Sequence, residues 1–445
     1  MICLTNVPNP TPFWKQNHHL FTNHVTNPIQ IKTNTYNNLK ITRHKFQTPT
    51  NLSFKVQDVI EEEEKKTKIK ALKLRLRPTR QQKLTLNRWA GCARFLYNKS
   101  IFLQTKTKLT KSQLRNRLAT VKNRTTGKFN SFYNNKVWLK DCPSSVRKCA
   151  VYDAVSNLQS CYSNVKNKNI KRFDLPFRTK KREILNGYGF SIEKQDIKKE
   201  KDKLFIAGDE FRYYGTKQLH KLIPSFKPEH DCKIQKSAFG EYFLIVPYTC
   251  YRDRVPTVFD NPISIDVGIR KNMTTYAPNK GESLMIGDRW SSSLMPLLLK
   301  LDNLYKDRKS NKQEIKRLRK RVFYLKKEFR DQASSYLSKN YDLVLISKLD
   351  TKEMSQKANR RLKTKTVRQM LNIGHSKLFQ SLKEKCWEHG SKFLHVGEEY
   401  TSQTCPCCGH RKKSGSETYS CSNCGFQQDR DIVGALNILL KAIKE

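Results

Sequence analysis

Four cysteines near the end of the chain have the spacing of a metal site. Two residues separate Cys405 from Cys408 and two separate Cys421 from Cys424, with twelve residues between the pairs. Four thiolates spaced in this way suit the tetrahedral coordination that Zn²⁺ prefers, and a site with four protein ligands has no open position for a substrate. We therefore predict one structural zinc ion held within residues 405–425; an iron–sulfur centre and a site without metal are the alternatives.

The remaining cysteines do not form a second pattern. Cys407 lies inside the first pair but breaks its two-residue spacing, so we leave it out of the ligand set. Of the 13 cysteines, all those outside this cluster are scattered singly along the chain. This usage is typical of a reducing compartment and not of a disulfide scaffold.

Two aspartates occupy positions where a carboxylate could bind a hard cation. Asp266 ends the apolar segment ISID and is followed by Gly268, so its carboxylate would stand at the end of a buried strand. An aspartate before a glycine is about equally often a simple turn. Asp431 stands just before GALNIL, where it could instead cap a helix, and Asp429 could play that part equally well. Spacing alone leaves these alternatives open.

The charge of the chain indicates a polyanionic partner. The 445 residues include 87 Lys and Arg against 39 Asp and Glu, a formal net charge of +48. A compact domain of that charge repels itself strongly unless it binds an anion, and nucleic acid is the natural candidate. A membrane is the weaker candidate, because no apolar run approaches the roughly 20 residues of a spanning helix. We therefore expect a nucleic-acid partner and no membrane.

Hydrophobic periodicity predicts the elements that must position these residues. The first 57 residues contain no Asp or Glu and no clear apolar period, so we expect residues 1–66 to be a disordered leader or, as the second choice, a targeting segment. The C-terminal half alternates between strand and helix patterns, which favours α/β layers with helices covering a mixed sheet. The expected strands are 69–77, 341–350 and 392–396, with a hairpin after ISID and a β-rich stretch at 173–250; the expected helices begin at 79 and span 111–121, 145–165, 296–338 and 363–389.

Several motifs, in order along the chain, carry a family resemblance. They are RLRPTRQQKLTLNRWAGCARFLYNKS, SIDVGIRKNMTTYA, YDLVLISKLDTKEM, EEYTSQTCPCCG with CSNCG, and DRDIVGALNIL. Together they resemble the TnpB/OrfB transposon-encoded nucleases, and most closely their eukaryotic and viral Fanzor branch, over residues 69–445. The resemblance implies an α/β plus β-barrel fold. Its parts would be a wedge β-barrel domain (67–78 and 172–258), a helical recognition domain (79–171), a RuvC-like, RNase H-type nuclease domain (259–404 and 426–445) and an inserted zinc ribbon (405–425).

The resemblance also implies an activity. Family members bind a guide RNA transcribed from the transposon end and cut DNA, so we expect an RNA-guided DNA endonuclease with guide RNA and target DNA as partners. We expect two catalytic Mg²⁺ ions, one structural zinc ion and a monomeric ribonucleoprotein. The nucleus is the expected compartment, with an organelle or the cytoplasm as alternatives; the basic cluster Thr179–Arg182 could serve nuclear import or simply bind RNA.

The family uses three carboxylates, and this sequence departs from its pattern at the second. Asp266 matches the first and Asp431 the third, but Ser347 stands where a glutamate is usual. A serine cannot supply the charge that holds two Mg²⁺ ions close together. Taken alone, this departure favours the alternative of a catalytically inactive zinc-ribbon protein that binds nucleic acid.

A relocated glutamate would restore the set. Fanzor-type relatives carry one just before the zinc ribbon in a pattern like E-x-Y-T-S, which Glu398 matches. Strand alternation places Glu398 on the face of Leu394 and Val396, and Glu399 on the other face. We therefore expect Asp266, Glu398 and Asp431 to be catalytic and to hold the Mg²⁺ ions. Glu399 is the second choice for the relocated carboxylate, and Glu353 the third.

Overall fold

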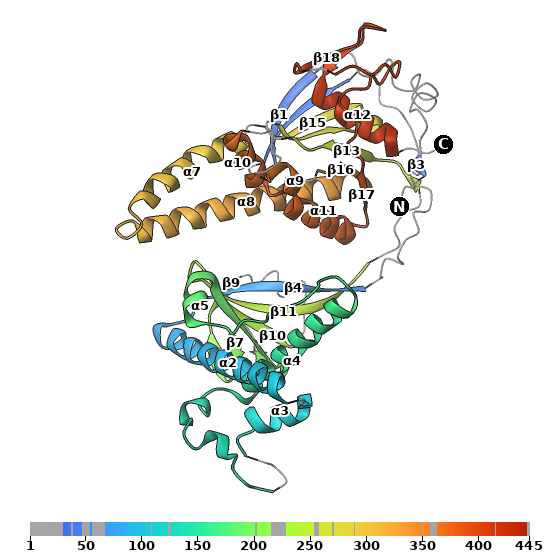
Figure 1. Ribbon diagram of the computed structural model, residues 1–445. Helices are drawn as coiled ribbons and strands as arrows, with labels where there is room; N and C mark the ends of the chain where they lie inside the picture. Colours follow the sequence, from blue (N-terminus) through green and yellow to red (C-terminus); the bar gives the residue numbers. More distant parts are fainter. Residues whose placement is uncertain are drawn as a thin grey trace. The chain divides into compact units, whose positions relative to one another are not determined.

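A computed structural model describes most of the chain. The residues outside the described part are 1–29, 37–38, 47–53, 56–66, 108, 123–125, 201–202, 215–227, 253–257, 269–270, 289, 350, 357–362, 414 and 443–445. The chain divides into two compact units, one formed by Thr67–Tyr251 and the other by the residues before and after this segment. Each unit has its own hydrophobic core and is described by itself (Figure 1).

The unit built from both ends of the chain is centred on a seven-stranded sheet. Its strands follow the order β1-β2-β15-β14-β13-β16-β17. They span Gln30–Tyr36 (β1), Leu39–Lys45 (β2), Pro262–Asp266 (β13), Lys271–Tyr276 (β14), Glu282–Asp288 (β15), Leu343–Ser347 (β16) and Lys392–Val396 (β17). Neighbours from β1 to β13 pair antiparallel, whereas β13, β16 and β17 run parallel. The carboxyl ends of these three parallel strands therefore meet at one edge of the sheet.

Helices cover both faces of this sheet, and the side-chain alternation of each strand decides which residues they cover (Figure 1). On one face α12 (Arg430–Ala442) packs against Leu343, Leu345 and Val396. On the other, α8 (Lys312–Asn340) and α11 (His375–His389) pack against Ile265, Val344 and Ile346. Their buried leucines and aromatics make the α/β layers that periodicity predicts.

The prediction of a disordered leader over residues 1–66 is wrong for β1 and β2, which pair with each other in this sheet. The segment Leu39–Lys45 pairs with β15, so that Ile41 lies opposite Ile286, and Leu39 and Ile41 are buried in the core. The alternation of apolar and polar residues in LKITRHK is a strand pattern, although the Asn- and Thr-rich surroundings obscure it. Residues 1–29 lie outside the described part of the chain.

Two stretches that periodicity predicts as single helices are each broken in two. Residues 296–338 fall in α7 (Trp290–Lys306) and α8, joined by a turn in which the Ser310 amide donates to the Asp307 carboxylate. Residues 363–389 form α10 (Thr364–Ile373) and α11, with Gly374 between them at φ 68°. A left-handed residue cannot continue a helix, and glycine adopts that conformation at little cost.

The other unit combines two antiparallel sheets with helices that pack on them. The first sheet has the order β5-β10-β11-β4-β9 and the second β6-β7-β8. The strands are Thr67–Leu76 (β4), Gly187–Ile192 (β5), Ile197–Glu200 (β6), Lys203–Ile206 (β7), Asp209–Phe211 (β8), Tyr213–Tyr214 (β9), Cys232–Ser237 (β10) and Tyr242–Tyr251 (β11). The helices α2 (Arg80–Lys106), α3 (Lys111–Leu118) and α4 (Ser144–Lys166) lie between β4 and β5 in the chain.

Several short strands and helices connect these larger elements. They are β3 (Phe54–Lys55), which pairs with β12 (Val258–Phe259), α5 (Lys180–Asn186), α9 (Thr351–Ser355), and β18 (Thr418–Ser420), which pairs with β19 (Gln427–Asp429). Among the described helices, none has the length and apolar character needed to cross a membrane.

Candidate nuclease centre and zinc ribbon

The carboxylates of Glu398 and Asp431 lie close enough to that of Asp266, at the carboxyl edge of the seven-stranded sheet, to raise its pKa. Asp266 is the last residue of β13, and Glu398 follows the last residue of β17 by two positions. Asp431 lies in the first turn of α12, which packs across that sheet face. The burial of the Asp266 carboxyl, and after it the charges of Glu398 and Asp431, raise the pKa of Asp266 to about 8. The structure therefore brings together the three residues that the sequence singles out.

A glycine of α12 makes room for the Asp266 carboxylate. A Cβ atom on Gly434 would lie 2.5 Å from Oδ2 of Asp266. One turn of the same helix is fixed to β13 by the Ser264 hydroxyl, which donates to the Ala435 carbonyl over 2.6 Å. Since Ser264 and Asp266 are two residues apart on one strand, both face α12. The small-residue helix thus holds this carboxylate in place.

Glu398 and Glu399 have different surroundings. Burial, and then the charge of Glu399, raise the pKa of Glu398. The Glu399 side chain is 72% exposed and pairs with Lys441 Nζ at 3.4 Å. Of the two, only Glu398 is among the groups that raise the pKa of Asp266. The strand itself ends at Val396, so Glu398 reaches the centre from the turn beyond β17 and not from the strand.

The serine at the departure from the family pattern is a buried part of the sheet edge. Ser347 is fully buried at the end of β16, between the strands that lead to Asp266 and Glu398. Its hydroxyl accepts a hydrogen bond of 3.4 Å from the Val267 amide. Ser347 therefore contributes no charge to the centre. The side chain of Glu353 lies outside the described part of the chain.

Two charged residues that the sequence analysis did not assign to the centre also lie there. Lys271, at the start of β14, forms an ion pair with Asp429, and its Nζ lies 3.5 Å from Asp431 Oδ2. Asp429 accepts from the Asp431 amide at 2.9 Å, so it is Asp429 that caps α12. Because Asp429 supplies the cap, the Asp431 carboxylate is left to face the centre. Lysine in the SIDVGIRK motif is the one sequence signal that could have pointed to this pair.

The chemistry of this carboxylate set fits a hard divalent cation. Carboxylate oxygens are the ligands that Mg²⁺ prefers. Burial, and after it the charges of Glu398 and Asp431, raise the pKa of Asp266, and a bound cation would offset both effects. The three carboxylates are nevertheless spread apart. In the part of the chain that the structure describes, only the four cysteines form a group of three or more His, Cys, Asp or Glu side chains whose ligand atoms all lie within 4.8 Å of one another.

The cysteine cluster has the geometry of a closed tetrahedral site. The Sγ atoms of Cys405 and Cys424 are 3.6 Å apart, and those of Cys408 and Cys421 are 3.5 Å apart. Four sulfurs at about 2.3 Å from a central Zn²⁺ would be about 3.8 Å from one another, so the cluster fits this ion. Cys407 lies outside the group, as the spacing predicts.

The two halves of the cluster form turns of the same type. The amides of Gly409 and Gly425 donate to the carbonyls of Cys405 and Cys421 over 3.0 and 3.1 Å, and both glycines have positive φ, 72° and 70°. The ribbon packs on α12 through Val433, Tyr419 and Cys421. The four-cysteine module therefore rests on the helix that carries Asp431.

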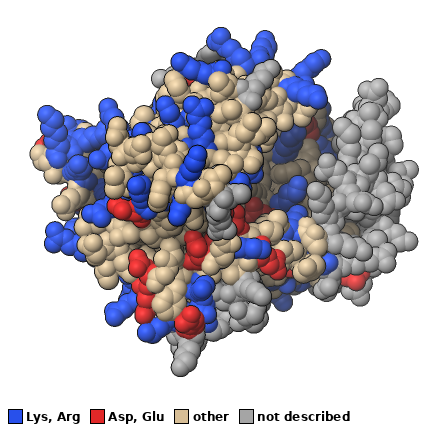
Figure 2. All heavy atoms as spheres, turned by 90° about the horizontal axis from the view of Figure 1, so that it is seen from below, with Lys and Arg blue, Asp and Glu red and all other residues tan. Residues whose placement is uncertain are grey.

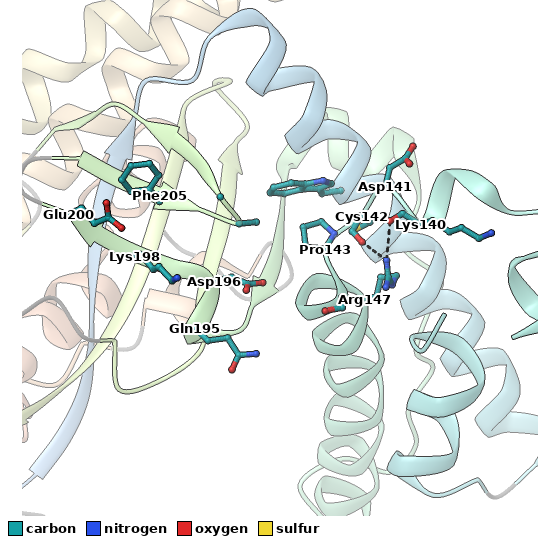
Figure 3. Close-up of a pocket in the computed structure, with 14 residues that line it drawn as sticks. Lys140, Asp141, Cys142, Pro143, Arg147, Gln195, Asp196, Lys198, Glu200 and Phe205 are labelled. Carbon is teal, nitrogen blue, oxygen red and sulfur yellow. Dashed lines mark hydrogen bonds between the residues drawn. The ribbon is translucent and has the colours of Figure 1, made fainter. Parts of the chain in front are cut away.

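Basic side chains offer surfaces for an anionic partner, whereas one open hollow is lined by charges of both signs, including Asp141, Asp196 and Glu200. Lys and Arg are spread over the face in Figure 2, with most of its Asp and Glu in the lower part. The unit Thr67–Tyr251 contains a hollow of about 750 Å³ whose lining includes Trp89, Lys140 and Lys198 (Figure 3). Arg147 also lines it, but this buried side chain donates to the Leu139 carbonyl at 3.1 Å and to that of Cys142. Arg147 therefore stabilises the loop and is not free to bind a ligand.

Comparison with known proteins identifies first the class and then the family. The model of the Cas12f1-like TNB domain matches residues 375–438, and a helix-turn-helix domain model matches residues 68–107. A solved Cas12f1 chain, from a complex with sgRNA and target DNA, covers 84% of this chain and 99% of its own length with a TM-score of 0.50 and 13% identity. With the sheet order and the four-cysteine cluster, this likeness defines a RuvC-like fold with an inserted zinc ribbon, as predicted.

Relatives in sequence then give the family. A protein of Paramecium bursaria Chlorella virus 1, named as a candidate transposase, is 31% identical over 84% of this chain and 87% of its own length. A TnpB-like protein of Acanthamoeba polyphaga mimivirus is 25% identical over 84% and 74%. InsQ of Escherichia coli, named as a candidate RNA-guided DNA endonuclease, is 23% identical over 84% and 92%. The chain belongs to the TnpB/OrfB-type family, which confirms the resemblance.

Proposed function

We propose that the protein is an RNA-guided DNA endonuclease that hydrolyses phosphodiester bonds. The observation that carries the proposal is the approach of Asp266, Glu398 and Asp431 at the carboxyl edge of a RuvC-like sheet. Support comes from a relative of similar length that is named as a candidate RNA-guided DNA endonuclease, and from the net charge of +48, which suits an RNA and a DNA partner.

Each residue of the centre has a distinct part in this proposal. Asp266, whose pKa burial and then the charges of Glu398 and Asp431 raise, would hold two Mg²⁺ ions together with these two carboxylates. The chemistry that such ions supply when bound is activation of the attacking water and stabilisation of the leaving oxyanion. Lys271 holds Asp431 and Asp429 in place through its ion pairs. Basic helices would hold the nucleic-acid backbones, and guide pairing would supply the sequence specificity.

The test is a cleavage assay on the protein purified with its own RNA. The co-purifying RNA is sequenced, and a plasmid that carries the matching target is incubated with the complex in Mg²⁺. We expect cutting by the wild type that chelator abolishes and that Asp266→Asn lacks. Cutting that survives RNase treatment of the complex would instead indicate a nuclease that needs no guide.

A second candidate function rests on Ser347. Without a charge at that position, the chain could be a zinc-ribbon protein that binds nucleic acid and no longer cuts it. In that case wild type and Asp266→Asn would leave the plasmid equally intact while both still bind RNA.

A further inference from the structure

The first turn of α11 is a helix start that no side chain caps. Gly374 is its N-cap, and the first turn contains no acidic residue. The amide groups at the start of a helix point outward and carry a partial positive charge, so this end favours an anion. A helix start alone does not make a site, but here other elements add to it.

Cations from α8, α10 and α11 gather at this helix start. Arg330 of α8 places Nη1 3.8 Å from the position a Cβ on Gly374 would take. Lys326, one turn earlier on α8, donates from Nζ to the side-chain oxygen Oδ1 of Asn372 over 2.6 Å. Burial, and then the charges of Arg330, Arg368 and Lys377, lower the pKa of Lys326. These like charges are therefore close enough to repel one another.

Carboxylates only partly neutralise this cluster: the charge of Asp331 opposes the burial that lowers the pKa of Arg330, and Asp331 is itself paired with Lys327. Arg368 is paired with Asp302. By contrast, the side chains of Arg330 and Lys377 form neither a hydrogen bond nor an ion pair with any residue that the structure describes. Lys326 contacts only a neutral amide. The excess of positive charge is what a bound anion would balance.

A buried, unpaired donor lies in the same cluster. Asn372 is 8% exposed, and its amide nitrogen has no hydrogen-bond partner among the described residues. Because its carbonyl oxygen is held by Lys326, the amide group lies beside the cations. His375, the first residue of α11, is 1% exposed, and its ring nitrogens are likewise unpaired in the described structure. Buried donors without partners are rare in folded proteins and call for an explanation.

A purely structural role explains less of this arrangement. Cations could stabilise the carboxyl end of α10, which ends at Ile373. That end carries only about half a negative charge. The one hydrogen bond that the cations donate there goes to a side chain and not to a helix carbonyl. Three cations and an unpaired amide exceed what capping α10 requires.

We propose that the start of α11, together with Lys326, Arg330, Lys377 and Asn372, binds a phosphodiester group of a nucleic-acid backbone. The amides of His375 and Ser376 would donate to the phosphate oxygens, because the Lys377 amide already donates to the Gly374 carbonyl. The three cations would balance the charge of the phosphate, and the buried Asn372 side chain would position Lys326 through its Oδ1. The inference rests on the proposed function for its ligand class. The phosphate belongs either to the guide RNA or to the target DNA, and the test separates the two.

The test compares two double variants that lose the same charge. Arg330→Gln with Lys377→Gln removes the two unpaired cations of the cluster. Lys316→Gln with Arg319→Gln removes two exposed cations of α8 away from it. RNA binding to the RNA-stripped protein, and target-DNA binding to the RNA-loaded complex, are titrated at several salt concentrations, with thermal unfolding of each variant as the folding check.

The cluster variant should weaken one of the two binding steps by roughly tenfold. It should also lower the slope of log affinity against log salt by roughly 0.7–0.9 for the lost phosphate contact. A loss in the RNA step assigns the phosphate to the guide, and a loss in the DNA step assigns it to the target. The charge-preserving pair Arg330→Lys with Lys377→Arg should retain most of the binding.

One outcome would overturn the phosphate site, and a different outcome would overturn the proposed function. If both double variants weaken both steps equally, the cluster is ordinary basic surface and the phosphate site is wrong. If the wild type binds neither RNA nor DNA, the proposed function itself fails.

Discussion

The contact between Gly434 and Asp266 allows the placement of the centre to be tested with one methyl group. In Gly434→Ala the new Cβ would lie 2.5 Å from Oδ2 and 3.2 Å from Cγ of Asp266, whereas Cβ contacts below 3.0 Å are essentially never observed. The carboxylate oxygen must therefore retreat by at least about half an ångström. The substitution acts on the centre without removing any of its charged groups.

The expected magnitudes separate activity from stability. Alanine in a helix interior is more stable than glycine by about 1 kcal/mol, and an overpacked methyl group typically destabilises by about 1–3 kcal/mol. The obstructing atom is the end of a short side chain that can rotate, so we expect the free energy of unfolding to change by no more than about 1 kcal/mol. A catalytic group displaced by about 1 Å can lower a rate by about 100-fold. We expect cleavage to fall between about 10-fold and 100-fold.

The assay is guide-dependent plasmid cleavage in Mg²⁺, alongside urea unfolding. Gly91→Ala is the matched control, because Gly91 is also a helix residue and its nearest neighbour would be Arg94 Nη2 at an ordinary 3.7 Å. That variant should cut like the wild type and be more stable by about 1 kcal/mol. If Gly434→Ala also cuts at the wild-type rate, the position of the Asp266 carboxylate against α12 does not matter for cleavage, and the proposed role of this contact is wrong.

Three further predictions concern the neighbouring groups. Glu398→Gln should lower cleavage by at least about 100-fold, with zinc content and RNA binding retained. The Glu399 carboxylate is mostly exposed, so cleavage by Glu399→Gln should stay within about threefold of the wild type. The reverse result would assign the role to Glu399. Cys421→Ser should lose the zinc ion and destabilise the ribbon, while Cys407→Ser should keep one zinc per chain in a metal assay. Retention of zinc by Cys421→Ser would remove Cys421 from the ligand set. Metal-free protein should lose stability as the pH rises from about 4 to about 8, because folded Asp266 keeps its proton up to a pKa of about 8 and the unfolded residue releases it near 3.8. In urea unfolding with chelator, Asp266→Asn should flatten this dependence of stability on pH. An unchanged dependence would exclude the Asp266 carboxyl as its cause.

Sequence patterns predict the parts of this fold that are strongly apolar or strongly spaced. The buried runs ISID and LVLIS read as strands, and the cysteine spacing predicts the ligand set that the structure brings together. The strand Leu39–Lys45 was missed because only two of its residues are buried in a polar neighbourhood, which is typical of a strand far from the sheet centre.

Breaks inside helices and pairs between distant charges are harder to predict. The apolar period runs on across Gly374, and nothing local shows that this glycine takes a left-handed conformation instead of a helical one. The ion pair of Lys271 with Asp429 joins residues 158 positions apart. Such a pair exists only once the sheet and α12 have packed together, so a reading of local spacing cannot contain it.

The order of the parallel strands explains how a carboxylate can be relocated without moving the centre. Ser347 lies opposite Val396 in the pairing of β16 with β17, and the strands of a sheet are about 4.8 Å apart. The register pairs of a parallel sheet project to the same face, so Ser347 and Val396 both face α12, and Glu398 follows Val396 by two positions. Ser347 meanwhile is fully buried and bonded to the Val267 amide, next to Asp266. A glutamate there would add a second buried carboxylate to a centre where Glu398 and Asp431 already raise the pKa of Asp266. The two positions are therefore alternatives for one charge, which is why the serine is compatible with an intact centre when Glu398 is present.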